Sequence, residues 1–591
     1  ALARGRVPVG GADPDWTLEE LDAADLVERA RTAVDGWDGP PWLKLGWFHA
    51  WLLLRDAVST DAAKADADAL FQRLTSAAYR GEVERVSLER RLVERLLAGC
   101  ERMVVGYAAR REHYTAEFSA GIENVAWDSH AGLNSAIFLR TVKLKDFPWN
   151  GWLRLATPAP PAAAWNPIAG FTDPAGRLLW AGLGDPAAFP TPYGAGWIGN
   201  RAPAPMVTVA PMSPPPGTLR PEPGTGALRP VGPGAAAGVK VVYRVLGSAF
   251  HDGTSVTTAD LVYPYAVAAR WGGSAAGGRG DHDPRVGAAT AGLREWLVGV
   301  KPVRIDTTVR EFAELEFATV THTLEVYGRR GGLEPDATAA IGPPWSPVPW
   351  HVTALMEEAV RRGMAAFSAG EARRRGVPWL DVVRDRPVKA RLASLLADLM
   401  ARSHVPEPLK GLVTPADARE RWAALERFHQ AHGHFLVTSG PYRLEKWSDD
   451  GAVLQVFRDF SYPLGVGSYD RYAIPRAARP VRVEVAEDAI TVHAEIEMVE
   501  KFSREYRLVR EPLERPSRER GPRDVPECRY VAIAADGTLA DTGVAPLEGP
   551  GVFRVRLKGR VAPGVYTVSL ALYLDGNQTN PDLRTVTYRV S

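Results

Sequence analysis

The chain has 591 residues, 46% of them hydrophobic and 24% charged, and its formal net charge is +1. These values are typical of a globular protein with roughly three or four domains, and the balanced charge argues against a nucleic acid or an anionic membrane as partner. The two cysteines, Cys100 and Cys528, exclude a disulfide framework and a thiolate metal cluster.

Residues 1–150 are mainly helical in pattern. Apolar residues recur at helical spacing over 21–34, 62–80 and 88–100, whereas residues 103–107 alternate as a strand does. The longest apolar stretch, residues 42–54, is interrupted by Lys44 and His49 and is too short to cross a bilayer. The chain starts at Ala1 without a signal sequence, so we expect a mature or trimmed product or, with slight preference, part of a longer sequence. This region is then either the end of a preceding lobe or an unrelated helical domain.

Residues 151–265 contain three segments with clear local signals. Residues 152–156 predict a strand that leads into a turn at Trp165-Asn166-Pro167. The Pro-, Gly- and Ala-rich residues 201–238 predict an excursion over the surface. Residues 243–265 then predict a strand, a turn at His251-Asp252-Gly253 and a helix that Thr257 or Thr258 caps, with Asp260 in its first turn.

Residues 266–435 predict mostly helices, the last of which should end at Gly433. The chain then returns to strands. We expect a short strand at 435–437, a turn at Gly440-Pro441 and two alternating strands at 442–447 and 453–457.

Three of these segments resemble, in the same order, parts of the extracellular solute-binding proteins of the dipeptide/oligopeptide class (family 5). Residues 250–262 resemble the family's Phe-His-Asp-Gly-Thr segment, and residues 433–444 resemble its Gly-Pro-Tyr return strand. Residues 152–167 resemble its opening strand and Leu-Asp-Pro turn, although Trp165 and Asn166 replace Leu and Asp. That replacement weakens the transfer of any ligand contact to this turn.

The resemblance implies an α/β, two-lobed fold like that of type II periplasmic binding proteins. Lobe one would comprise residues 151–265 and 436–478, and a helix-rich lobe two would comprise 266–435. The crossings near residues 265 and 435 would then form the hinge.

Residues 479–591 differ in pattern from the rest of the chain. Apolar residues alternate at period two over 481–485, 491–497, 552–557 and 566–572, and turn signals separate some of these runs. The spacing predicts an antiparallel β-sandwich, immunoglobulin-like in outline but without the internal cysteine pair.

The search for catalytic motifs finds no nucleophile elbow, phosphate-binding loop or dinucleotide fingerprint, so we expect no enzyme and no cofactor. His429, His432 and His434 are spaced as metal ligands can be, but Gly433 should separate the first two from the third. We therefore interpret them as surface or junction histidines and predict no metal site.

Aromatic residues give a better indication of function. The chain has 18 tryptophans, several of them in Pro- or Gly-flanked segments where core packing is unexpected. Ligands of mixed polarity are commonly held between apolar and aromatic walls. The predicted ligand-binding residues are Trp165, Asn166, Trp345, Trp350, His351 and Tyr442.

Together, these patterns and the resemblance favour a periplasmic or extracellular solute-binding protein. It would bind a peptide-like or other small solute by hinge closure and deliver it to the membrane subunits of an ABC importer. The alternative is a structural or scaffold subunit that keeps this fold without binding solute.

Overall fold

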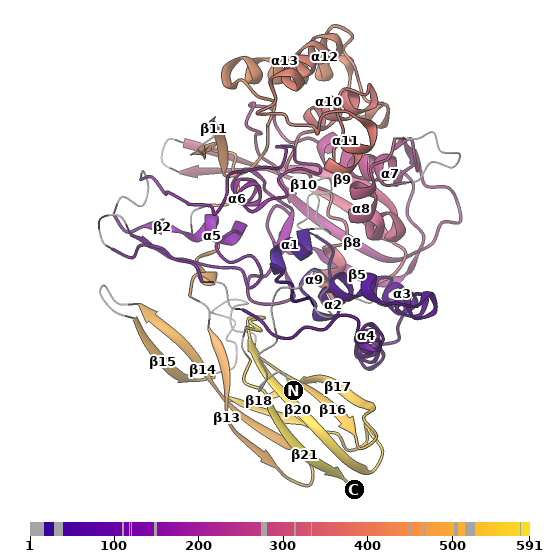
Figure 1. The fold of residues 1–591 in the computed structure, drawn as a ribbon, viewed down its shortest axis with the longest axis vertical. Coiled ribbons are helices and arrows are strands. Elements are labelled where there is room, and N and C mark those ends of the chain that lie inside the picture. Colours follow the sequence, from indigo (N-terminus) through magenta and orange to yellow (C-terminus); the bar gives the residue numbers. More distant parts are fainter. Residues whose placement is uncertain are drawn as a thin grey trace.

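The computed structural model describes all of the chain except residues 1–16, 29–38, 109–110, 118, 120, 147–150, 274–280, 313–314, 332–333, 449–450, 466, 475, 502–505, 514–525 and 580. The described part is a mixed α/β structure with several antiparallel sheets, which confirms the predicted class at this level. A large sheet lies in the middle of the molecule (Figure 1). The helices of residues 350–432 lie at one end, and the C-terminal strands lie at the other.

The described part of the N-terminal region contains four α-helices: α1 (Ala23–Glu28), α2 (Gly46–Leu54), α3 (Asp61–Thr75) and α4 (Glu82–Leu97). The side chain of Thr60 caps α3 by accepting a hydrogen bond from the N–H of Ala63. The predicted helices are confirmed at α3 and α4, whereas the predicted helix at 21–34 is described only as far as Glu28. The predicted strand at 103–107 is wrong, because this segment pairs with no described strand and Tyr107 is 95% exposed.

The central sheet has six antiparallel strands in the order β5-β8-β10-β9-β6-β7. Its strands are β5 (Met206–Met212), β6 (Leu219–Pro221), β7 (Leu228–Pro230), β8 (Ala237–Leu246), β9 (Leu297–Phe312) and β10 (Leu315–Gly328). Alternate residues of β8 are fully buried, among them Val241, Tyr243 and Val245. They share one core with helices α7 (Thr258–Gly272) and α8 (Pro284–Trp296).

The sheet does not follow the predicted lobe boundary at residue 265. Residues 321–328 of strand β10, from the predicted lobe two, pair with residues 239–246 of β8, from the predicted lobe one. A single core cluster, moreover, runs from Trp165 to Leu444 and takes residues from both predicted lobes. The long β9–β10 hairpin is the physical reason, because it returns the chain to the sheet before the helical block begins.

Helices dominate the chain from Pro335 to His432, as predicted. They are α9 (Pro335–Ala339), α10 (Trp350–Arg361), α11 (Ala369–Arg375), α12 (Arg386–Ala401) and α13 (Pro415–His432). Helix α13 ends where expected, because Gly433 adopts a left-handed φ of 72° that residues with a side chain rarely take.

Shorter elements complete this part of the molecule. They are the hairpin β11 (Tyr442–Ser448) with β12 (Gly451–Val456), the pair β1 (Ile122–Glu123) with β2 (Lys143–Leu144), the pair β3 (Ala188–Pro190) with β4 (Trp197–Gly199), and helices α5 (Ala136–Thr141) and α6 (Pro174–Leu183). The predicted strands at 152–156 and 435–437 are wrong, since neither segment joins a described sheet. Residues 435–437 are instead a fully buried connection without regular secondary structure, in which the N–H of Val437 donates to the carbonyl of Phe435 at 3.0 Å.

The C-terminal region consists of two antiparallel sheets. One is built from β13 (Ala477–Val485), β14 (Ile490–Lys501), β15 (Tyr506–Pro512), β18 (Leu547–Gly549) and β19 (Val552–Val555). The other has the order β17-β16-β20-β21 and is built from β16 (Pro526–Ala534), β17 (Leu539–Ala545), β20 (Gly564–Leu574) and β21 (Arg584–Val590). Both contribute to one core cluster, in which Val492 and Phe553 come from the first sheet and Tyr530 and Val568 from the second.

We expect residues 478–591 to fold when expressed alone, because this cluster is separate from the core around the central sheet. The fragment should give a β-type circular dichroism spectrum and a cooperative urea transition. A fragment without a cooperative transition would contradict the prediction and show that this region depends on the rest of the chain.

Candidate functional site

The segments that resemble the solute-binding family meet inside the molecule. The N–H of His251 donates to the carbonyl of Thr438 at 2.9 Å. The imidazole Nε2 of His251 lies 2.9 Å from the carbonyl oxygen of Gly440. Residues almost two hundred positions apart in the sequence are therefore in direct contact.

The third segment reaches the same region through Val382. The N–H of Val382 donates to the carbonyl of Trp165 at 3.1 Å, and its carbonyl accepts from the N–H of Phe435 at 3.0 Å. One residue thus connects the turn at 165–167 to the return segment.

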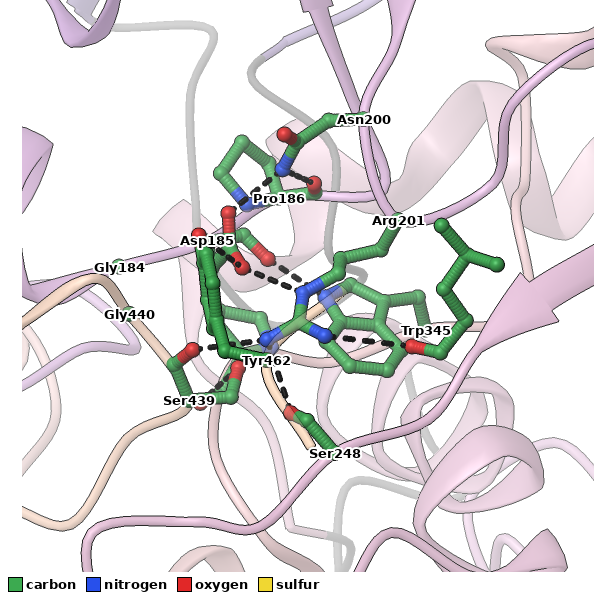
Figure 2. Close-up of polar contacts among 12 residues, drawn as sticks. Gly184, Asp185, Pro186, Asn200, Arg201, Ser248, Trp345, Ser439, Gly440 and Tyr462 are labelled. Carbon is green, nitrogen blue, oxygen red and sulfur yellow. Dashed lines mark hydrogen bonds and ion pairs between the residues drawn. The ribbon is translucent and has the colours of Figure 1, made fainter. Parts of the chain in front are cut away.

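A buried network of charged groups lies beside this junction (Figure 2). Arg201 and Asp185 form an ion pair in which both side chains are fully buried, and Arg140 joins it at 2.9 Å from Asp185. The Nη2 group of Arg201 also donates to the Ser248 hydroxyl and to the Ser439 carbonyl, both at 2.9 Å. Arg201 therefore ties the central part of the chain to the return segment.

The partners of Asp185 keep it ionised. Burial raises the pKa of this carboxyl, but the positive charges of Arg201 and Arg140 outweigh burial and lower the pKa below its usual range. The amide of Asn200 donates to Asp185 at 2.6 Å, and the Trp345 indole N–H donates to the Asp185 carbonyl at 2.6 Å. The carboxylate of Asp185 and the guanidinium of Arg201 are paired with each other and with protein groups, so we interpret the network as one that holds the fold together.

The predicted ligand-binding residues do not belong to the linings of the two cavities described below. Trp165, Trp345 and Trp350 are buried in the central core, and none of them lines the cavities described below. Their Pro-rich neighbourhoods are buried loops here, because contacts distant in sequence cover them: Trp345 packs within 5.1 Å of the Arg201 guanidinium. The prediction that these three rings face ligand is not supported by this placement.

The other predicted site residues also have structural partners. Asn166 is buried, and its amide donates to the carbonyls of Phe367 and Leu380 at 3.2 and 2.8 Å. The Tyr442 hydroxyl is half-buried and lies 3.4 Å from the Leu139 carbonyl.

His351 forms a buried pair with Asp252, with 2.8 Å between Nε2 and the carboxylate. Burial raises the pKa of Asp252, but the hydrogen bond and charge of His351, together with Thr254, bring this pKa down to about 2. The pair resembles the histidine and the carboxylate of a catalytic triad, but neither residue lines a described cavity.

The three clustered histidines point to different neighbours. The ring of His429 stacks on Phe435 at 4.0 Å, while the rings of His432 and His434 lie 6.1 Å apart. Within the described residues, no group of three or more His, Cys, Asp or Glu side chains could hold a metal ion.

The best candidate for a binding site is a cavity of about 1010 Å³ between α5, α6 and the segments 111–117 and 151–158, which have no regular secondary structure. Its volume is at the upper end of the range of roughly 300 to 1000 Å³ typical of small-molecule sites. Trp152 is 74% exposed and lines the cavity together with Tyr114 and Phe138. The charged lining residues carry both signs: Arg111, Glu112, Asp146 and Arg154.

The buried charge network fixes the helices that form one wall of this cavity. Arg140, near the end of α5, donates to the carbonyls of Ala181 and Gly184 at 3.2 and 3.3 Å and so caps the C-terminus of α6. At the opposite ends, the Asn134 amide donates to the Pro174 carbonyl at 2.8 Å. The wall is therefore rigidly held, whereas the segment that carries Trp152 belongs to no described sheet.

Sequence reasoning missed most of this cavity. Trp152 belongs to a segment whose alternation indicates a strand, and its exposure depends on that strand not pairing. The buried ions Arg140, Asp185 and Arg201 carry no local signal, because isolated charged residues in loops and helices are normally exposed.

Comparison with known proteins adds no identification. No family model matches the chain, and no curated protein matches it significantly. Among the described residues, no helix has the length and apolarity needed to cross a membrane.

Proposed function

We propose that this chain is an extracytoplasmic solute-binding protein, similar to family 5, that delivers a peptide-like or other small solute to an ABC importer. The observation that carries the proposal is the cavity of about 1010 Å³ with exposed aromatic rings and charges of both signs in its lining. Such a lining suits an amphipathic or zwitterionic molecule, because rings stack on its apolar parts while side-chain charges pair with its termini. The meeting of the three family-like segments in one region is independent support.

The two sides of the cavity differ in how firmly they are held, and this difference suggests how a solute would be bound. The wall of α5 and α6 is fixed by Arg140 and Asp185, and the segment around Trp152 faces it without strand partners. A solute that contacts both sides would stabilise a closed arrangement over an open one, which is the basis of hinge closure. The buried Oδ1 of Asn134 has no partner among the described residues and would accept a hydrogen bond from the solute.

We expect Trp152→Ala to weaken solute binding by about 1 to 3 kcal/mol, because the ring offers an exposed apolar face to the cavity. A panel of dipeptides to pentapeptides is first screened by thermal shift, and the affinity of each hit is then measured by calorimetry. Phe460→Ala is the matched control, since Phe460 is also a highly exposed aromatic residue (76%) but does not line the cavity. Equal affinities for the two variants and the parent chain would contradict this placement of the site.

A structural or scaffold role is the second candidate. The observation that favours it is the closed packing around Trp165, Trp345 and Trp350, where a bound solute was predicted from the sequence. Small-angle X-ray scattering separates the two functions: a solute-binding protein becomes more compact when a peptide hit is added, whereas a scaffold gives no hit and no change.

A further inference from the structure

A second cavity, of about 210 Å³, lies between the N-terminal helices and α8. Its floor is apolar and well ordered by packing, since Trp42, Phe48, Leu293, Trp296 and Ile341 are all buried. The rings of Trp42 and Phe48 meet edge to face at 6.3 Å. None of the residues of this cavity belongs to the solute cavity around Trp152.

Small residues on α8 keep this space open. The helix presents Ala288, Ala289, Ala291 and Gly292 to the cavity. A Cβ at Gly292 would lie 3.5 Å from the ring of Trp42, so any larger side chain there would extend into the space in front of that ring. The void is therefore a consequence of the residues at these positions and can be closed by substitution.

The mouth of the cavity is positively charged. Arg329 and Arg330 are exposed at the rim, where Glu295 is the one carboxylate among the described lining residues. The Arg329 side chain donates to the backbone carbonyl of Glu295 at 2.9 Å, and the Trp296 indole N–H donates to the Arg330 carbonyl at 2.9 Å. The first bond positions the side chain of Arg329, and the second holds the backbone of Arg330 beside the opening.

We propose that this cavity binds a small amphipathic anion, with a ring in the apolar floor and a carboxylate at the two arginines. An apolar cavity of about 150 Å³ is large enough for benzene, so the present volume suits one substituted ring. The arginines would add charge-assisted hydrogen bonds that a neutral molecule of the same shape cannot make. This site is independent of the proposed solute cavity.

Three probes with one apolar body test the proposal: 3-phenylpropionate, 3-phenylpropanol and 3-phenylpropylamine, each titrated into the full chain by calorimetry. We expect the carboxylate to bind about tenfold more tightly than the alcohol, and the amine to bind most weakly. The double variant Arg329→Gln/Arg330→Gln should bring the affinity for the carboxylate to within about twofold of that for the alcohol.

Gly292→Leu, which fills the cavity, should weaken binding of the carboxylate by at least about tenfold. Ala289→Leu serves as a second filling variant in case the first does not fold. Ala62→Leu, on an exposed position of α3 outside the cavity, is the control and should bind like the parent chain. The proposal is overturned if none of the probes binds, if the three bind equally, or if a folded filling variant keeps the parent affinity. Trp152→Ala should leave this binding unchanged, so failure here and failure of the solute site are distinguishable.

Discussion

Replacing Asp185 with alanine is expected to lower the free energy of unfolding by about 3 to 5 kcal/mol. The substitution leaves Arg140 and Arg201, whose side chains are 5% and 0% exposed, without their counter-charge. A buried cation is no longer solvated by water. Water can take the place of the missing carboxylate only if the fold rearranges. Urea unfolding of the full chain, followed by tryptophan fluorescence, measures the change.

Asp398→Ala is the matched control. Asp398 also pairs with two arginines, Arg362 at 3.0 Å and Arg402 at 2.8 Å, but its side chain is 43% exposed. Loss of such a solvent-screened surface pair should change stability much less than loss of Asp185. If the two variants were equally stable, the network around Arg201 would not stabilise the fold as we describe.

A double variant separates the effect of losing the ion pair from the effect of leaving one charge buried without its partner. The double variant Arg201→Met/Asp185→Ala removes both members of this fully buried pair. We expect it to lose less stability than the sum of the losses in the two single variants, because no unpaired charge of this pair remains buried. Additive losses would indicate that Asp185 and Arg201 contribute independently, against the geometry of their ion pair.

Local structure was predictable from the sequence where local chemistry decides it. The predicted start of α7 is confirmed, because Thr257 is its N-cap and Asp260 lies in its first turn, where the two residues form a capping box. The end of α13 at Gly433 depends on one residue that tolerates positive φ. In both cases the deciding groups lie within three or four positions of one another.

Strands were less predictable, because a strand also needs a partner. Residues 103–107, 152–156 and 435–437 have strand-like patterns but join no described sheet, whereas the β9–β10 hairpin arose within a block predicted to be helical. Alternation describes one segment and does not say which other segment will pair with it.

The candidate site was the least predictable part. Trp345 looks like a ligand wall from its Pro-rich neighbours, but Arg201 and Asp185, more than a hundred residues earlier in the chain, enclose it. The exposure of Trp152 likewise depends on the absence of a strand partner. Neither burial nor exposure at these positions follows from neighbouring residues alone.

Acidification from pH 6.5 to pH 4 is expected to destabilise the fold, with about 3 kcal/mol of the loss due to His251. Burial lowers the pKa of this imidazole from 6.5 to about 4, the hydrogen bond to Gly440 opposes that shift, and among the nearby charges Arg443 lowers the pKa while Asp252 and Asp185 raise it. The hydrogen bonds explain which form is buried. A carbonyl accepts from Nε2, so Nδ1 is the acceptor for the Thr438 hydroxyl at 3.2 Å.

The sign of the effect follows from the order of protonation. As the pH falls below 6.5, the unfolded chain binds a proton at His251, while the folded chain keeps it neutral until about pH 4. The stabilising contribution of this group is therefore complete above pH 6.5 and is lost as the pH falls to 4. Other buried histidines add to the slope, since burial also lowers the pKa of His434 to about 3.

The variant His251→Gln isolates the contribution of His251. A glutamine amide can still donate to the Gly440 carbonyl but does not titrate, so the variant should lose about 3 kcal/mol less than the parent chain between pH 6.5 and 4. Urea unfolding at half-unit pH steps measures this difference. His282→Gln, at an exposed imidazole, is the control for a His→Gln substitution outside this site. If the His251→Gln curve were parallel to that of the parent chain, then His251 would titrate alike in the folded and unfolded states, and its burial between the two family-like segments would have no energetic consequence.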